Sequence, residues 1–407
     1  MRIIHSSDWH IGQNFMNKSR ESEHRAFLNF LLTNLINLGV DALVVAGDIF
    51  DTGTPPSYAR NLYFDFLKEA KEKWGGQIVI VGGNHDSVAT LSESEALLQL
   101  ANTIVVGGAK DDPTEEVFVL NKLSGEPGAV ICAVPFLRDR DVRKSQAGED
   151  ATAKSEALRQ GISKHYSDVY EVAREKDKEL GGNLPLIATA HLTTQGGTLT
   201  EGVRELYIGT LQGYASEDFP ADFDYIALGH LHKKQIMGQR DHIRYCGSPI
   251  PLSFIEAEYE RTVNLVDFAA DKSITVEEIV VPVTQELQTL RGNIMKITES
   301  LQNLLMESGD KSVWLEIEVE VDESQGAVSK EFNAIVEGSN IEILRIKRRQ
   351  KNKKNQPSQL KAVQLHEMTV EEVFQKRLSE AELDSEKSDQ LAMAFKELHA
   401  ELLEENS

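Results

Sequence analysis

Short polar motifs follow apolar runs at five places in this chain of 407 residues. The residues that could bind a metal are Asp8 and His10 in HSSDWHIG, Asp48 in GDIFD, Asn84 in GNHD, His191 after LIATA, and His230 and His232 in GHLH. Such residues are usually structural when they occur singly. Together they predict one metal centre, and the mixture of oxygen and imidazole ligands favours Mn, Fe or Zn over Mg or Ca.

We expect this centre to hold two divalent ions. Asp8, His10 and His232 are predicted to bind one ion, Asn84, His191 and His230 the other, and Asp48 to bridge them. Two ions about 3.5–4 Å apart lower the pKa of a water molecule between them and neutralise a phosphate during an in-line displacement. The pattern therefore predicts hydrolysis of a phosphate ester.

His85 directly follows Asn84, and consecutive loop side chains diverge. We therefore expect it to be a catalytic residue that donates a proton to the leaving oxygen or pairs with the phosphate charge, with Asp86 orienting it. The other histidines are interpreted as structural: His5, His24, His165, His242, His366 and His399.

The first 110 residues predict alternating strands and helices. Apolar strands are expected in RIIH, DALVVAGD, QIVIVGG and NTIVVGG, and helices over about 19–39 and 55–76. This order is typical of parallel strands with helices on the faces of the sheet. Because the carboxyl ends of parallel strands share one edge, the predicted ligands should meet there.

More strands follow residue 115, interrupted by one long helix over about 150–178. Residues 1–283 therefore predict an α/β fold, an α+β sandwich of four layers in which two central sheets are flanked by helices.

The pattern changes beyond residue 283. Leucine and isoleucine spacing predicts an amphipathic helix over 285–306, and the alternation in VWLEIEVEV predicts a strand over 313–321. We expect a small α/β cap domain over 284–350, a linker over 351–365, and a helical segment over 366–407 that packs on its own core or on a partner helix.

Residues 345–354 carry 7 basic side chains in ten positions, whereas the chain as a whole has a net charge of −22. The acidic balance opposes general binding to nucleic acid. We therefore expect DNA to meet only a local basic face, formed by Lys347, Arg348, Arg349, Lys351, Lys353 and Lys354. The alternative interpretation is a solvated charged run before a linker.

The motifs D-x-H, G-D, G-N-H-D, H and G-H-x-H resemble those of the calcineurin-like metallophosphoesterases. HSSDWHIG, GDIFD and YCGSPIPLSFIEAE (245–258) resemble, within that group, the SbcD nuclease subunits of bacterial SbcCD complexes. The seven predicted ligands match the two-metal ligands of this family and His85 its catalytic histidine, over the first 283 residues.

The resemblance implies Mn²⁺-dependent 3′-to-5′ exonuclease activity on double-stranded DNA ends and endonuclease activity on hairpins and single strands. These activities would serve DNA recombination, replication and repair. It also implies a homodimer joined to SbcC-type ATPase subunits in a heterotetramer. No Gly-Lys dipeptide occurs, so we expect ATP to be bound by the partner.

Two alternatives remain open from the sequence. One is a stand-alone phosphatase or phosphodiesterase acting on small phosphate esters, which the metal motifs alone do not exclude. The other is a non-catalytic scaffold that binds DNA ends or SbcC, which the complete ligand set argues against. The absence of a signal-peptide pattern and of a long apolar run predicts a cytoplasmic protein without membrane spans.

Overall fold

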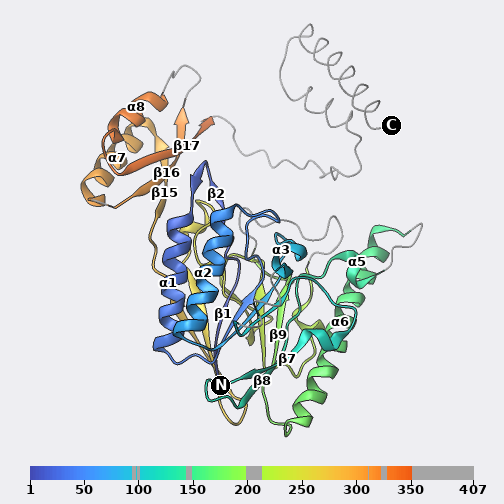
Figure 1. Ribbon diagram of the computed structural model, residues 1–407. Coiled ribbons are helices and arrows are strands. Elements are labelled where there is room, and N and C mark those ends of the chain that lie inside the picture. The colour runs from blue at the N-terminus through green and yellow to red at the C-terminus, as the bar shows by residue number, and fades with distance from the viewer. Residues whose placement is uncertain are drawn as a thin grey trace, which may run out of the picture. The chain divides into compact units, whose positions relative to one another are not determined.

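The computed structural model describes residues 1–93, 98, 101–143, 149–198, 213–309, 311–321 and 328–350 (Figure 1). The chain divides into the units 1–350 and 351–407, and the described residues all belong to the first. The predicted linker, the terminal helical segment and Lys351, Lys353 and Lys354 lie outside the described residues. No helix within these ranges is long and apolar enough to span a membrane.

The first sheet has six strands in the order β14-β13-β1-β4-β5-β6. Strands β1 (Arg2–Ser6), β4 (Ala42–Ala46), β5 (Gln77–Val81) and β6 (Thr103–Val106) are parallel neighbours, as the alternating pattern predicts. Strands β13 (Thr262–Phe268) and β14 (Ile274–Val280) extend the sheet antiparallel.

The second sheet also has six strands, in the order β11-β12-β10-β9-β8-β7. Its centre is parallel and consists of β8 (Pro127–Cys132), β9 (Leu186–His191), β10 (Tyr225–Gly229) and β12 (Arg240–Tyr245). Strands β7 (Val117–Asn121) and β11 (Gln235–Met237) pair antiparallel at its edges.

Three apolar cores separate four layers. One core packs helices α1 (Glu21–Asn37) and α2 (Ser57–Lys73) on the first sheet, a second lies between the sheets, and a third packs α6 (Ala151–Glu179) on the second sheet (Figure 1). Short helices α3 (Val88–Ser92) and α5 (Asp139–Val142) lie in the connections. The predicted four-layer fold with two central sheets is confirmed.

A smaller parallel sheet follows, made of β15 (Glu286–Asn293), β16 (Val313–Val321) and β17 (Ile341–Gln350). Helices α7 (Ile294–Ser308) and α8 (Val328–Val336) cover one face of this sheet around a separate apolar core. We call residues 286–350 the cap. The predicted strand over 313–321 is confirmed, but the predicted helix over 285–306 is wrong in its first part, which forms β15.

Candidate metal centre

The predicted ligands lie where strands of both large sheets end. Asp8 and His10 follow β1, Asp48 follows β4 and Asn84 follows β5, at the carboxyl edge of the first sheet. From the second sheet, His191 is the last residue of β9, and His230 and His232 follow β10. The centre therefore joins the two sheets, which approach each other at this edge.

The backbone that presents these residues is locally strained. Asp8, His10, Asp48 and His230 all have positive φ angles, of 54°, 46°, 51° and 100°. Each such conformation costs a residue other than glycine about 1–3 kcal/mol and persists where the surroundings hold it. Here Asp8 N donates to Gly47 O and His10 N to Asp48 O, both at 3.0 Å, so the first two ligand loops hold each other.

Two glycines permit the close approach of these loops. A Cβ atom on Gly229 would lie 1.8 Å from Ala46 O, and one on Gly83 would lie 2.1 Å from Asp48 Oδ1. Both contacts are far shorter than atoms allow, so neither position accepts a side chain without moving the loops apart. Beside Gly229, His230 N donates to Asp8 Oδ1 at 2.8 Å and ties the two sheets together.

The ligand atoms form two groups. In one group, atoms of Asp8, His10 and His232 all lie within 4.8 Å of one another, and in the other the same holds for Asp48, His191 and His230. Asn84 joins the second group, because its Oδ1 lies 3.0 Å from His191 Nε2 and 3.2 Å from His230 Nδ1. This is the grouping expected from the sequence.

Asp48 lies between the groups. Its Oδ2 is 3.5 Å from His10 Nε2 in the first group and 3.3 Å from His191 Nε2 in the second. Its Oδ1 accepts a hydrogen bond from His85 N at 2.9 Å, which fixes the orientation of the carboxylate. This geometry is compatible with the bridging role predicted for Asp48.

The imidazoles are oriented from behind by oxygen atoms. Nδ1 of His10 lies 3.2 Å from Asp51 Oδ1, and Nδ1 of His232 lies 2.9 Å from Glu256 Oε1. Nδ1 of His191 is held in the same way by Ala46 O at 2.9 Å. A hydrogen bond at one ring nitrogen directs the other toward an ion, as is usual for metal-bound histidine. Neither Asp51 nor Glu256 was predicted from the sequence.

The site has the chemistry that a pair of cations requires. Nε2 atoms of His10 and His230 are buried without a hydrogen-bond partner in the described part of the chain. Buried polar atoms are normally satisfied, so two such atoms in one cluster call for a ligand. Burial opposes protonation of His10, yet the bond to Asp51 and the charge of Asp48 raise its pKa to about 9. The cluster thus attracts positive charge.

Charge and burial also shift the pKa values of Asp48 and His230 in the same cluster. Burial disfavours the ionised form of Asp48, but the neighbouring His191 and His10 hold the pKa of its carboxyl well below its usual range. Burial and the adjacent His191 lower the pKa of His230 well below its ordinary value. Asp48 is therefore an anion and His230 a neutral imidazole, which are the forms that coordinate divalent ions.

His85 lies beside the cluster and Asp86 lies behind it. Nδ1 of His85 donates to Asp51 O at 2.7 Å, and the His85 ring packs edge-on against His10 with centroids 4.7 Å apart. The buried Asp86 carboxylate instead accepts from the backbone N–H groups of Gly83, Ile49 and Phe50 at 2.9–3.1 Å. Asp86 therefore joins two ligand loops through their backbone, and its role in orienting His85 stays a prediction.

Two of the predicted DNA-contact residues that the structure describes are paired within the cap. Lys347 lies 3.2 Å from a Glu316 carboxylate oxygen, and Arg349 lies 2.7 Å from one of Glu318. The glutamates are almost fully buried on β16. Of the predicted DNA-contact residues within the described ranges, Lys347 and Arg349 therefore pair with carboxylates of the neighbouring strand, while Arg348 and Arg349 are exposed.

The combination of a two-sheet sandwich with ligands at shared strand ends defines a phosphoesterase. Residues 1–234 match the family described as calcineurin-like phosphoesterase. Residues 283–382 match a second family, described as type 5 capsule protein repressor C-terminal domain and abbreviated SbcD_C.

Similar proteins cover between 66% and 97% of this chain. The SbcD subunit of nuclease SbcCD from Escherichia coli strain K12 is 44% identical over 397 residues, covering 97% of each chain. The proteins of the same name from Rhodobacter capsulatus and Bacillus subtilis are 37% and 30% identical, and cover 66% and 79% of this chain and 67% and 79% of their own. The chain therefore belongs to the SbcD family of calcineurin-like phosphoesterases, which are metal-dependent hydrolases.

Proposed function

We propose that this chain is a Mn²⁺-dependent DNA nuclease. It cleaves double-stranded ends in the 3′-to-5′ direction and opens hairpins and single strands, in recombination, replication and break processing in the cytoplasm. The observation that carries the proposal is the position of Asp48 Oδ2 between two complete ligand groups, with His85 beside them.

The ligand set supports a pair of ions. Asp8, His10 and His232 would hold the first ion, Asn84, His191 and His230 the second, and Asp48 both. When bound, such a pair supplies a nucleophile from water at neutral pH and neutralises charge on the phosphate. Mixed nitrogen and oxygen donors suit Mn²⁺ better than Mg²⁺.

His85 supplies the proton chemistry. Because its Nδ1–H is committed to Asp51 O, the proton available for transfer is the one on Nε2. Protonated His85 neutralises charge on the phosphate and gives this proton to the leaving oxygen, which otherwise departs as an alkoxide. The half-buried position of His85 leaves the ring beside the ligand groups instead of within either one.

The partners follow from the family. The relatives are named as subunits of SbcCD, so we infer an SbcC-type ATPase partner and a homodimer of this chain within a heterotetramer. The segment 366–407 is the proposed ATPase-binding part.

The proposal is tested with Mn²⁺ on a blunt duplex labelled at one 5′ end, a hairpin, and a small chromogenic phosphodiester, with and without the ATPase partner. We expect stepwise shortening of the labelled strand and opening of the hairpin. Activity confined to the small diester would instead identify a stand-alone phosphodiesterase. Two bound ions without activity on any substrate, even with the partner present, would indicate a scaffold.

A further inference from the structure

Glu256 is a fully buried carboxylate that holds a predicted metal ligand. Its Oε1 lies 2.9 Å from His232 Nδ1, and its Oε2 accepts from Leu252 N at 3.0 Å. Arg261, also buried, lies 3.6 Å from Glu256 Oε2 and donates to His232 O at 3.0 Å. Glu256 and Arg261 thus fix both the ring and the backbone of His232.

The two residues that follow Glu256 contact the cap. All three form the short 3-10 turn η3 (Glu256–Glu258). Ala257 packs against an apolar cluster that includes Leu287 of β15 and Trp314 of β16. The Glu258 carboxylate lies 3.5 Å from the guanidinium of Arg291 on β15. One turn therefore faces the metal centre with its first residue and the cap with the next two.

The cap residue Trp314 is also anchored to the phosphoesterase side. Its ring stacks on Phe15, with centroids 6.0 Å apart and planes 9° apart. The guanidinium carbon of Arg20 lies 5.8 Å from the Trp314 ring, and Arg20 donates to Pro251 O at 2.9 Å. Pro251 lies in the same segment as Glu256. The cap is therefore linked to this segment both through Arg20 and through η3.

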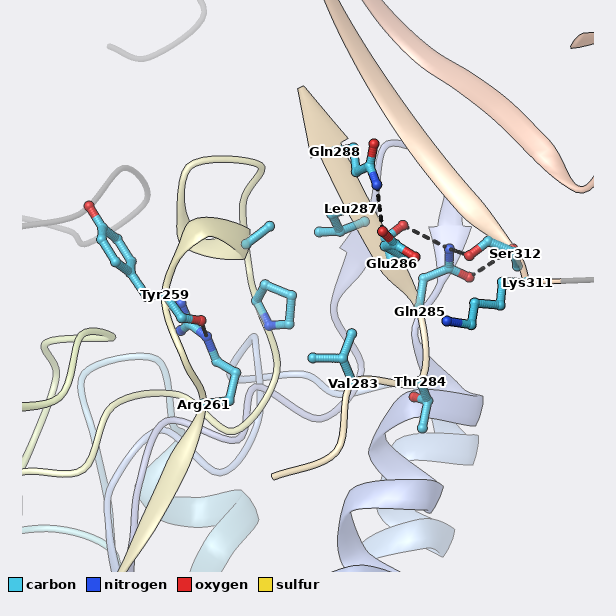
Figure 2. A pocket seen from close by; sticks show the side chains of 12 residues that line it. Tyr259, Arg261, Val283, Thr284, Gln285, Glu286, Leu287, Gln288, Lys311 and Ser312 are labelled. Carbon is cyan, nitrogen blue, oxygen red and sulfur yellow. Dashed lines mark hydrogen bonds between the residues drawn. The ribbon is translucent and has the colours of Figure 1, made fainter. Parts of the chain in front are cut away.

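Beside these contacts the junction is open. A cavity of about 570 Å³ lies at this junction and is lined by Pro251, Ala257, Tyr259 and Arg261, by residues 283–288 that lead into the cap, and by Lys311 and Ser312 (Figure 2). Figure 2 shows Tyr259 and Arg261 on one side of this space and Leu287 and Lys311 on the other. Tightly packed interiors resist displacement, whereas a cavity leaves room for it, so a shift of the cap would reach the segment around Glu256 through the contacts of η3 and of Arg20.

We propose that Glu256 is a positioning residue for the first metal ion, and that η3 couples the seating of the cap to that ion alone. The second group is held differently, since His191 is fixed by Ala46 O and contacts Asn84. Any load on the cap, from a polymeric substrate or a partner, would change the affinity of the first ion and leave the second unchanged. This inference rests on the proposed function for the ligands assigned to the two ions and for the identity of the ions.

The first test measures Mn²⁺ binding by titration calorimetry on the full chain without DNA. The Asn84→Ala background removes a ligand of the second ion, so that binding of the first ion is measured alone. There, Glu256→Gln, which keeps the size of the side chain, should weaken binding about 10–100-fold, the usual effect of losing such a carboxylate. Glu299→Gln, at an exposed position of α7, makes the same charge change and should leave the Mn²⁺ affinity unchanged. Unchanged affinity in Glu256→Gln would overturn the positioning role.

The second test perturbs the cap side. Leu287→Ala removes part of the junction contact, and Leu304→Ala makes the same truncation inside the cap core, away from η3. We expect Leu287→Ala to weaken the binding of the first ion several-fold and Leu304→Ala to leave its affinity unchanged. Neither variant should change the affinity of the second ion, which is measured in the His232→Ala background. Equal effects of the two leucine variants would overturn the coupling.

A double-mutant cycle shows whether the effect passes through Glu256. If it does, Leu287→Ala should add little in the Glu256→Gln background, whereas additive effects would exclude this route. The Leu287 measurement also stands if Glu256→Gln fails to fold. Because metal binding is measured without substrate, loss of the nuclease proposal would leave these results intact, and the two failures remain distinguishable.

Discussion

A backbone carbonyl determines which nitrogen of His85 holds its resting proton. Asp51 O accepts from Nδ1, and the same residue uses its side chain to hold His10. Asp51 therefore holds His10, a predicted metal ligand, and His85, the proposed proton donor, in a fixed relation. The rings of His10 and His85 lie with their centroids 4.7 Å apart, so the proposed acid adjoins a predicted ligand.

Replacing His85 by Gln should lower kcat on duplex DNA by about 10²–10⁴-fold, the usual contribution of a general acid. Because His85 groups with His10 and Asp51 and belongs to neither group of predicted ligands, the variant should still bind two Mn²⁺ ions. The check is a single-turnover cleavage assay together with metal analysis of the same sample. His242→Gln on β12 is the matched control. Full activity in His85→Gln would remove this residue from the mechanism.

The clustering of the predicted ligands could be inferred because each lies within four residues of the end of an apolar strand, and parallel strands bring their ends to one edge. The supporting residues were not predicted. Glu256 lies 24 residues from His232 along the chain, in a turn without periodicity, and its role depends on burial. The backbone contacts of Asp86 were not predicted either, because adjacency in GNHD suggests a contact with the neighbouring side chain, while the Asp86 carboxylate accepts from three backbone N–H groups.

At the scale of elements, the cap shows where periodicity misleads. Leu287 and Leu290 continue the helical spacing of α7, although they belong to β15 and pack on different sides of it. A local signal for the true helix start was present in the sequence. Asn293 is the N-cap of α7 and its side chain accepts from Lys296 N at 2.9 Å, as asparagine commonly does at this position.

Strand β16 holds part of the charge of the basic stretch. Glu316 is 1% exposed and accepts hydrogen bonds from Arg345 and Lys347. Glu316→Gln should remove about 1–3 kcal/mol of cap stability, since charged hydrogen bonds are lost. It should also strengthen DNA binding at low salt and steepen its salt dependence, because the two cations become available to phosphates.

Fluorescence anisotropy across a salt series, with thermal unfolding of the same samples, measures both effects. Glu320→Gln changes the same charge on the same strand at an exposed position and should leave both nearly unchanged. If the two variants bind DNA alike, the glutamates of β16 do not restrain the basic stretch.

At the scale of the whole molecule, the candidate metal centre connects the two large sheets. The hydrogen bond from His230 to Asp8 spans 222 residues of sequence, and the one from His191 to Ala46 spans 145. Ions held by both sheets would bind the folded chain but not the unfolded one. Metal binding should therefore stabilise residues 1–283 as a unit, in addition to its role in hydrolysis.

Removal of the ions should thus lower the thermal stability of the whole phosphoesterase. At a free Mn²⁺ concentration 100-fold above Kd, one site contributes about 2.7 kcal/mol, which corresponds to a shift in Tm of roughly 5–10 °C for a domain of this size. Asp48→Asn should lose most of the Tm shift that the two ions produce together, because Asp48 faces both groups. Asn84→Ala removes a ligand of the second group only and should retain about half of that combined shift. Calorimetry with chelator and with Mn²⁺ measures the three proteins, and an equal shift in all of them would show that Asp48 does not bridge the ions.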